Sequence, residues 1–483
     1  MRVVSAWVTP VLLLAVATAL IAGGRDGLWL ALLFVVAPLF VSLAAPQPAA
    51  GGDRQWLPPA VLVVVLGLVV WANLSLAGDV AAWMGWPRGL GVMPAALAAA
   101  VVILWPAVSR WRFWFVPVGL LGLLLPVAGM VQASGSNPLA IWSEVASLPA
   151  FRFSPQSPWV TEGRAVGPRR GLALLTFDEE HRLTPADPGP LRVEVSDSGR
   201  VQVQEWRLAP GQSVTLRPGD RLQLDGPRRL KFEADKRVPG APASGTAWAD
   251  SSFAPRSLRL LPVLGLGLTL LGGAVALAGP ASSAPPTRAG VALGGVVLLV
   301  LLGWAECWAV FAVRWAPELY LGGVSGAALL ELPRLVLHGR AWGSLLAAAG
   351  LAGLFALFLA ASLALRDQLA VVVPDRGLPA GTLVVTALLA LMPIEPWSLM
   401  LTALGLGASC LAPLIVLGPP PARPHAATWA LGVGFVLFLG VTAAGRLWMP
   451  AGSVAQALVA YPALVAAPAA AAVLRVAGRP ARA

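Results

Sequence analysis

Residues 290–315, which read GVALGGVVLLVLLGWAECWAVFAVRW, decide the class of fold. The only charged side chains in this stretch are Glu306 and Arg314, and about 20 consecutive apolar residues suffice to cross a bilayer as an α-helix. The stretch therefore predicts a transmembrane helix. At about 1.5 Å per residue, Glu306 lies roughly 24 Å along that helix from Gly290, nearer one edge of the bilayer than its middle.

The rest of the chain repeats this pattern. Of 483 residues, 57% are hydrophobic and 12% are charged, whereas charged residues make up roughly 25% of an ordinary soluble domain. Apolar runs suited to membrane helices lie near 6–23, 28–45, 58–78, 91–109, 113–132, 258–279, 290–312, 343–364, 379–394, 398–418, 427–445 and 453–474. The sequence predicts a polytopic α-helical membrane protein with about 12 transmembrane helices, five within residues 1–133 and seven within residues 257–483.

One segment of the second helical group breaks the pattern. Residues 315–342 are too interrupted for a membrane span, and their apolar residues alternate with Glu331, Arg334 and His338 at helical spacing. An amphipathic helix of this kind lies along a membrane surface. We therefore expect an interfacial segment on the outer face near residues 315–342.

Residues 134–256 form a polar block between the two helical groups. Its central part, GRVQVQEWRLAPGQSVTLRPGDRLQLDGPRRLKFEAD at residues 199–235, alternates apolar with polar residues and contains Pro-Gly pairs. Such alternation between turns is typical of half-buried strands. Residues 171–177 and 191–195 show the same alternation, so the block predicts an inserted all-β domain, a small antiparallel sandwich or barrel.

The positive charge is concentrated outside the β domain. The formal charge is +11, and the block at 134–256 holds 16 Lys and Arg against 14 Asp and Glu, which leaves +9 for the helical part. Arginines beside membrane spans explain such an excess. The β domain has no basic stripe with interleaved aromatic residues, so a nucleic-acid partner is not expected.

The arginines also predict the orientation of the chain. With both termini in the cytoplasm, the cytoplasmic ends and short loops carry eleven arginines, more than the opposite short loops carry. Positive residues favour the cytoplasmic side of a membrane. We therefore expect a multi-pass protein of the cell (inner) membrane with both termini cytoplasmic and the β domain periplasmic or extracellular.

The sequence lacks the residues that several chemistries need. Its three histidines, at 181, 338 and 425, are far apart, and its cysteines, at 307 and 410, form no CxxC pair. No nucleotide-binding loop or hydrolase motif occurs, so no catalytic residue, metal or cofactor is predicted. The acidic run FDEEHR at 177–182 could bind a hard cation, but a solvated loop is the favoured interpretation. Asn73, within a span, is expected to form a hydrogen bond between helices.

One group of charged residues remains as a candidate site. With the predicted orientation, Glu306, Arg314, Glu395 and Arg446 all lie toward the outer leaflet, together with Glu318, Glu331 and Arg334. Charged residues in or near membrane helices often mark substrate paths. We consider two interpretations, a functional outer-leaflet cluster and a set of interfacial anchors that pair among themselves.

Three functions agree with these observations, and fold alone does not choose among them. A non-catalytic subunit or assembly factor of a membrane complex, with its β domain docked on a partner, is favoured because few polar residues lie in the spans. The first alternative is a transporter or flippase of a lipophilic or lipid-linked substrate. The second is a membrane transferase or polymerase at the outer leaflet, with Glu306 or Glu395 as base. The expected partners are the lipid bilayer and a protein that binds the β domain or the helices.

Overall fold

The computed structural model describes most of the chain. The described residues are 2–44, 59–105, 111–167, 173–197, 200–226, 228–249, 260–278, 288–322, 326–337, 341–372, 377–417, 424–448 and 453–477.

Helices dominate both sides of a central β region. Those before it are α1 (Arg2–Trp7), α2 (Pro10–Gly23), α3 (Leu28–Ala44), α4 (Pro59–Trp83), α5 (Gly89–Leu104) and α6 (Arg112–Ser134). Those after it include α10 (Leu260–Ala278), α11 (Arg288–Trp315), α14 (Ala341–Val372), α15 (Gly377–Ala390), α16 (Pro396–Leu406), α17 (Ala412–Leu417), α18 (Pro424–Trp448), α19 (Ser453–Ala460) and α20 (Ala463–Ala477). The five residues between α16 and α17, Gly407–Leu411, form a π-helical turn.

Six described helices are long and apolar enough to cross a membrane. They are Ala60–Trp83, Trp114–Ser134, Arg288–Trp315, Ala341–Leu369, Pro396–Leu417 and His425–Gly445. The pair Val454–Ala460 and Ala463–Ala477, bent by 71°, passes the same test together. Shorter apolar helices are Pro10–Gly23, Leu28–Leu43, Gly89–Leu104, Leu261–Leu277 and Leu378–Ala390. The predicted helical, multi-pass membrane class is confirmed at this level.

Small residues allow close packing of the helices. A Cβ added to Gly122 of α6 would lie 2.6 Å from the Cα of Gly353 in α14, so the two backbones touch where neither residue has a side chain. In the same way, a Cβ added to Gly272 of α10 would lie 2.5 Å from the Cβ of Ala408 in the π-helical turn. Membrane helices associate through such small residues, because lipid offers no hydrophobic drive to bring them together.

Asn73 is one of the few buried polar side chains within the helical part. Asn73 of α4 donates to the carbonyl of Val69 (2.8 Å) and accepts from the backbone amide of Val11 in α2 (3.4 Å). The Val11 amide lies in the first turn of α2, where amides have no partner within the helix. The predicted hydrogen bond between helices is therefore confirmed.

The β region consists of eight described strands in two antiparallel sheets. One sheet has the order β1 (Arg164–Val166), β8 (Arg228–Lys231), β3 (His181–Pro185) and β6 (Val214–Leu216). The other has the order β2 (Ala173–Thr176), β7 (Arg221–Leu224), β4 (Gly189–Asp197) and β5 (Arg200–Leu208). Short helices α7 (Pro138–Ala146), α8 (Pro158–Thr161) and α9 (Gly245–Ala249) flank the strands. The predicted antiparallel β region is confirmed.

The alternation of the strands separates the core of the β region from its surface. Leu222 and Leu224 of β7 are buried, and Leu222 pairs with buried Val193 of β4, so these residues share one face. On β5 the same alternation does not bury the apolar side chain. Val203 pairs with Glu194 of β4 and is exposed. The sequence pattern therefore identified the strands, whereas their place in the sheet decided which apolar side chains are buried.

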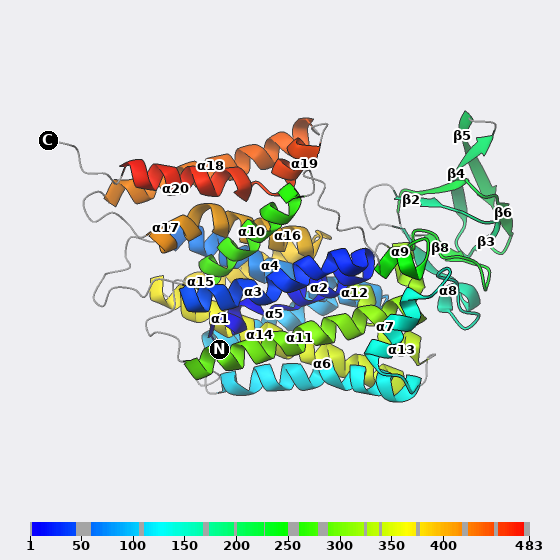
Figure 1. Cartoon of the computed structure of the whole chain (residues 1–483), viewed down its shortest axis with the longest axis horizontal. Coiled ribbons are helices and arrows are strands. Elements are labelled where there is room, and N and C mark those ends of the chain that lie inside the picture. The colour runs from blue at the N-terminus through cyan, green and yellow to red at the C-terminus, as the bar shows by residue number, and fades with distance from the viewer. Residues whose placement is uncertain are drawn as a thin grey trace.

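The strands lie at one end of the helical part (Figure 1). Figure 1 shows the long helices running along one common direction, with the β region at the right and both chain ends at the left. Two side chains from different parts of the chain bind α2. The indole of Trp248 in α9, beside the strands, donates to the carbonyl of Ile21 (3.0 Å), and the hydroxyl of Tyr320, from the segment that follows α11, donates to the same oxygen.

The segment near residues 315–342 differs from the expected surface helix. It contains three short helices, η5 (Pro317–Gly322), α12 (Gly326–Leu329) and α13 (Leu332–Val336). Leu319, Leu329 and Leu332 are buried, and the indole of Trp308 donates to the carbonyl of Leu329 (3.0 Å). Proline and glycine interrupt the helix, so the segment folds back against its neighbours. His338 lies outside the described residues.

Candidate functional site

The residues of the predicted outer-leaflet cluster do not form one connected group among the described contacts. No hydrogen bond or ion pair among the described residues joins Glu306, Arg314 and Glu395 to one another. Glu306 is half-buried on α11 and has no ion-pair partner among them. Arg446 belongs to α18, but its side chain lies outside the described part of the structure. Three separate polar groups stand at this end of the helices instead.

The first group joins α11 to the start of the β region. Arg314 contacts the carboxylate of Glu144 in α7 through Nε at 2.8 Å and Nη2 at 2.6 Å. Its guanidinium carbon also lies 5.8 Å from the centre of the Trp315 ring. Both nitrogens meet the same oxygen, Oε1 of Glu144, and hydrogen bonds between ionised groups are stronger than those between neutral groups. Arg314 therefore holds α7 against the end of α11, and its partner lies outside the predicted cluster.

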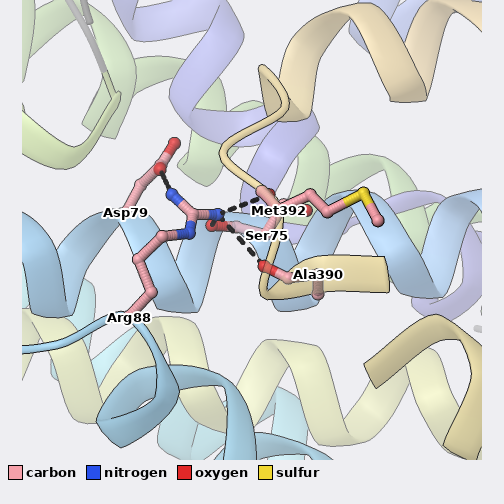
Figure 2. Close-up of polar contacts among 5 residues, drawn as sticks. All are labelled: Ser75, Asp79, Arg88, Ala390 and Met392. Carbon is pink, nitrogen blue, oxygen red and sulfur yellow. Dashed lines mark hydrogen bonds and ion pairs between the residues drawn. The ribbon is translucent and has the colours of Figure 1, made fainter. Parts of the chain in front are cut away.

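The second group surrounds Arg88, at the start of α5 (Figure 2). Its guanidinium pairs with Asp79 of α4 and donates to the carbonyls of Ser75 (3.3 Å), Ala390 (3.2 Å) and Met392 (3.3 Å). Ala390 ends α15, where the last carbonyls of a helix have no partner within it. Arg88 supplies those donors, and the sequence analysis missed it because it resembles any other arginine beside a span.

Glu395 lies close to this second group. It occupies the N-cap position of α16 without a side-chain capping bond. Partial burial raises the pKa of its carboxyl, and the negative charge of nearby Asp79 raises that pKa further. Glu395 therefore lies near Arg88 and Asp79, and its environment is that of a turn between two membrane helices.

The third group lines a cavity of about 180 Å³ between the β region and the helices, which we call the junction pocket. The segment that leads into β1 contributes Ser154, Gln156, Ser157, Pro158, Thr161, Glu162 and Arg164. The segment that follows α11 contributes Trp315, Glu318, Glu331, Arg334 and Leu335. Three residues expected toward the outer leaflet, Glu318, Glu331 and Arg334, are thus brought together.

Glu318 is the most deeply buried acid of the junction pocket, with 2% of its surface exposed. The backbone amide of Ser154 donates to its Oε1 at 3.4 Å. Burial raises the pKa of Glu318 to about 7, although hydrogen bonds from Ser157 and from backbone amides oppose that shift. A carboxyl group that titrates near neutral pH inside a pocket is a common property of functional sites.

Glu331 joins the two sides of the junction pocket. Its Oε2 lies 3.6 Å from Arg164 of β1, and its Oε1 lies 3.1 Å from Arg334 of α13. Glu331 is buried, whereas both arginines are partly exposed. This carboxylate therefore holds two guanidinium groups at the wall of the pocket. Arg164 had no distinguishing signal in the sequence, since the polar block contains many arginines.

Two acidic residues of the run at 177–182 contact Arg237. Arg237 contacts the carboxylates of both Asp178 and Glu179, the latter through its backbone amide. His181 is buried beside Phe153 and Phe177 and accepts or donates a hydrogen bond with the carbonyl of Arg237 at 3.0 Å. Among the described residues, no group of three His, Cys, Asp or Glu side chains is placed to hold a metal ion.

Comparison with other proteins adds no family to this description. The chain matches no protein-family model, and no curated protein or solved structure is significantly similar to it. The fold and the polar groups define a multi-pass helical membrane protein with an antiparallel β region at one end of its helices. Its function must be argued from the residues themselves.

Proposed function

We propose that the chain is a non-catalytic subunit or assembly factor of a membrane complex, which presents its β region to a partner protein outside the cytoplasm. The observation that carries this proposal is the outer edge of β5, with which no other described strand pairs. Strand β5 pairs with β4 over nine residues, from Arg200 to Leu208, and it ends the order of its sheet. An edge strand has unpaired amides and carbonyls that an extended segment of another protein can join.

The side chains of β5 support this docking role. Val203 is 61% exposed, and Gln202, Gln204 and Glu205 beside it are exposed as well. Strand β7 covers β4 only at Arg192–Glu194, so much of the β4–β5 pair extends beyond the rest of its sheet. Projecting strands with polar and apolar side chains suit an extended partner segment that adds as a strand.

The membrane arrangement proposed with this function has 12 spans. In this arrangement the six long helices, the bent pair and the five shorter apolar helices each cross the membrane once. Support comes from Figure 1, in which the two chain ends lie away from the strands. Together with the positive charge of the terminal segments, this favours cytoplasmic termini and a periplasmic or extracellular β region in the inner membrane.

Replacement of Val203 tests the docking role. Lysine on an edge strand discourages further strand pairing, so Val203→Lys should remove a protein that co-purifies with the chain from gently solubilised native membranes. The matched control is Arg182→Lys, on the exposed face of the interior strand β3. A partner retained by Val203→Lys, or the absence of any stoichiometric partner, would contradict the proposal.

The junction pocket favours a second candidate function. A cavity lined by a buried acid, two arginines and a tryptophan at the end of a membrane helix suits a protein that binds an outer-leaflet substrate, as a transporter or a transferase does. In that function Glu318, rather than Glu306 or Glu395, is the candidate base. Glu306→Gln separates the two sites, because it should leave binding in the junction pocket unchanged.

A further inference from the structure

The junction pocket lies beside the end of a helix that is long and apolar enough to cross a membrane. Trp315 is the last residue of the span Arg288–Trp315 and lines the pocket, and tryptophans concentrate where hydrocarbon meets headgroups. On its other side the pocket is closed by the segment that leads into β1. A ligand in this cavity would therefore touch both the helical part and the β region.

The charges of the lining are balanced. Arg164 and Arg334 carry two positive charges, and Glu331 and Glu162 carry two negative charges. Glu318, with a pKa near 7, adds only part of one negative charge at neutral pH. A phosphate ligand would need surplus guanidinium groups, and an ammonium ligand would need surplus carboxylates. The balance therefore favours an uncharged polar ligand.

The hydrogen-bonding groups match a ligand rich in hydroxyls. Ser154 carries a hydroxyl and Gln156 an amide, and both groups can donate and accept. The hydroxyls of Ser157 and Thr161 donate to Glu318 and to the carbonyl of Ser157, respectively, and each keeps an acceptor for a ligand. A hydroxyl of the ligand can both donate and accept. The deeply buried Glu318 carboxyl provides acceptors in both protonation states and a donor when protonated.

Trp315 provides the aromatic part of the lining, together with the apolar side chains of Pro158 and Leu335. Its ring stacks on Phe311, with ring centres 5.0 Å apart and planes inclined by 23°, so its orientation is supported from α11. Aromatic rings combine a flat apolar face with a polar edge, and a sugar ring has a matching face of C–H groups. The cavity of about 180 Å³ is smaller than the roughly 300–1,000 Å³ of pockets for drug-sized ligands, which limits the ligand to about one ring.

We propose that the junction pocket binds one sugar unit of an uncharged glycan at the membrane surface, between Trp315 and the polar segment at 154–164. The proposal rests on the second candidate function and is independent of docking through β5. The sugar can belong to a free glycan or to a glycolipid, since both present the same hydroxyls and C–H face.

Binding of defined sugars tests the proposal. The full chain is purified in a detergent without a sugar headgroup and exposed to the methyl glycosides of glucose, galactose, mannose and N-acetylglucosamine, with saturation-transfer NMR as readout. At least one glycoside should bind, and Gln156→Ala and Trp315→Leu should weaken it about tenfold or more, which corresponds to the loss of one good contact. Matched controls are Gln202→Ala on β5 and Trp114→Leu, both exposed outside the pocket.

Further measurements distinguish a glycolipid from a free glycan and define the results that would overturn the proposal. Stronger binding of an alkyl glycoside held in phosphatidylcholine vesicles than of the methyl glycoside assigns a glycolipid, whereas equal binding assigns a free glycan. If no glycoside binds the folded chain, or if inorganic phosphate or phosphoethanolamine binds in their place, the proposal is overturned. If a sugar binds but Val203→Lys does not remove a co-purified protein, this proposal stands and only the docking role is contradicted.

Discussion

Glu318 is a carboxyl group whose burial makes the stability of the fold depend on pH. Its pKa is about 7 in the fold against 4.5 for the free group. Between these values the unfolded chain has lost the proton and the folded chain retains it, so folding stability decreases as the pH rises from about 4.5 to about 7. Each pH unit in this window costs at most about 1.4 kcal/mol.

Replacement of Glu318 with Gln should remove this dependence. Gln keeps the shape and remains neutral, so the thermal midpoint of Glu318→Gln should decrease less than that of the unmodified chain between pH 5 and pH 8. Thermal unfolding in detergent at several pH values measures the difference. Parallel curves for the two proteins would show that Glu318 does not titrate in this range.

Arg88 should be the most costly arginine to replace in the helical part. Arg88→Met removes an ion pair of Asp79 and the donors of the Ala390 and Met392 carbonyls, and a largely buried polar group that loses its hydrogen bond typically costs about 1–3 kcal/mol. Asp79→Asn should cost less, because the carbonyls keep their donor.

A double-mutant cycle on Asp79 and Arg88 measures their coupling. Residues in direct contact typically show interaction energies of about 0.5–3 kcal/mol, so the double variant should be more stable than the sum of the single effects implies. Additive effects of the two replacements on the thermal midpoint would argue against the pair shown in Figure 2.

At the scale of elements, the pair of α6 and α14 depends on glycine. A Cβ at Gly353 would lie 2.8 Å from the carbonyl oxygen of Gly119 and 2.9 Å from the carbonyl carbon of Gly122. Gly353→Ala should therefore push the two helices apart and destabilise the protein by about 1–3 kcal/mol, as overpacking does.

A glycine with open space provides the control for this pair. A Cβ at Gly303 of α11 meets nothing within 4 Å, so Gly303→Ala should be neutral or stabilise slightly through helix propensity. The thermal midpoints of both variants in detergent measure the contrast. Equal midpoints would mean that the close approach of α6 and α14 does not limit stability.

The charged residues of the junction pocket are carried mainly by short elements rather than by the long helices. The loop and short helices between α11 and α14 carry Glu318, Glu331 and Arg334. Because η5 and α13 are interrupted, these side chains turn toward the β region, where Arg164 meets Glu331. A continuous surface helix would have spread them along one membrane face, and no enclosed cavity would have formed.

At the scale of the whole molecule, the strands and the chain ends lie at opposite ends of the helices (Figure 1). A membrane-impermeant maleimide tests the proposed orientation. In a background without Cys307 and Cys410, Arg217→Cys in the β region should react in intact cells, and Arg475→Cys near the end of α20 should react only after permeabilisation. Both positions are exposed. The reverse order of labelling would invert the proposed orientation.

The sequence by itself determined the helical membrane class and the strands, because apolar run length and alternation are local properties of the chain. It also predicted that Glu318, Glu331 and Arg334 lie on one side of the helical part, and the structure brings all three to the junction pocket. Only the tertiary structure decided the partners of charged residues. Arg88 reaches a carbonyl 302 positions away, and Arg164 meets a glutamate of a different element. Local sequence cannot distinguish one arginine from another, since each guanidinium binds whichever acceptors the packed helices and sheets bring near it.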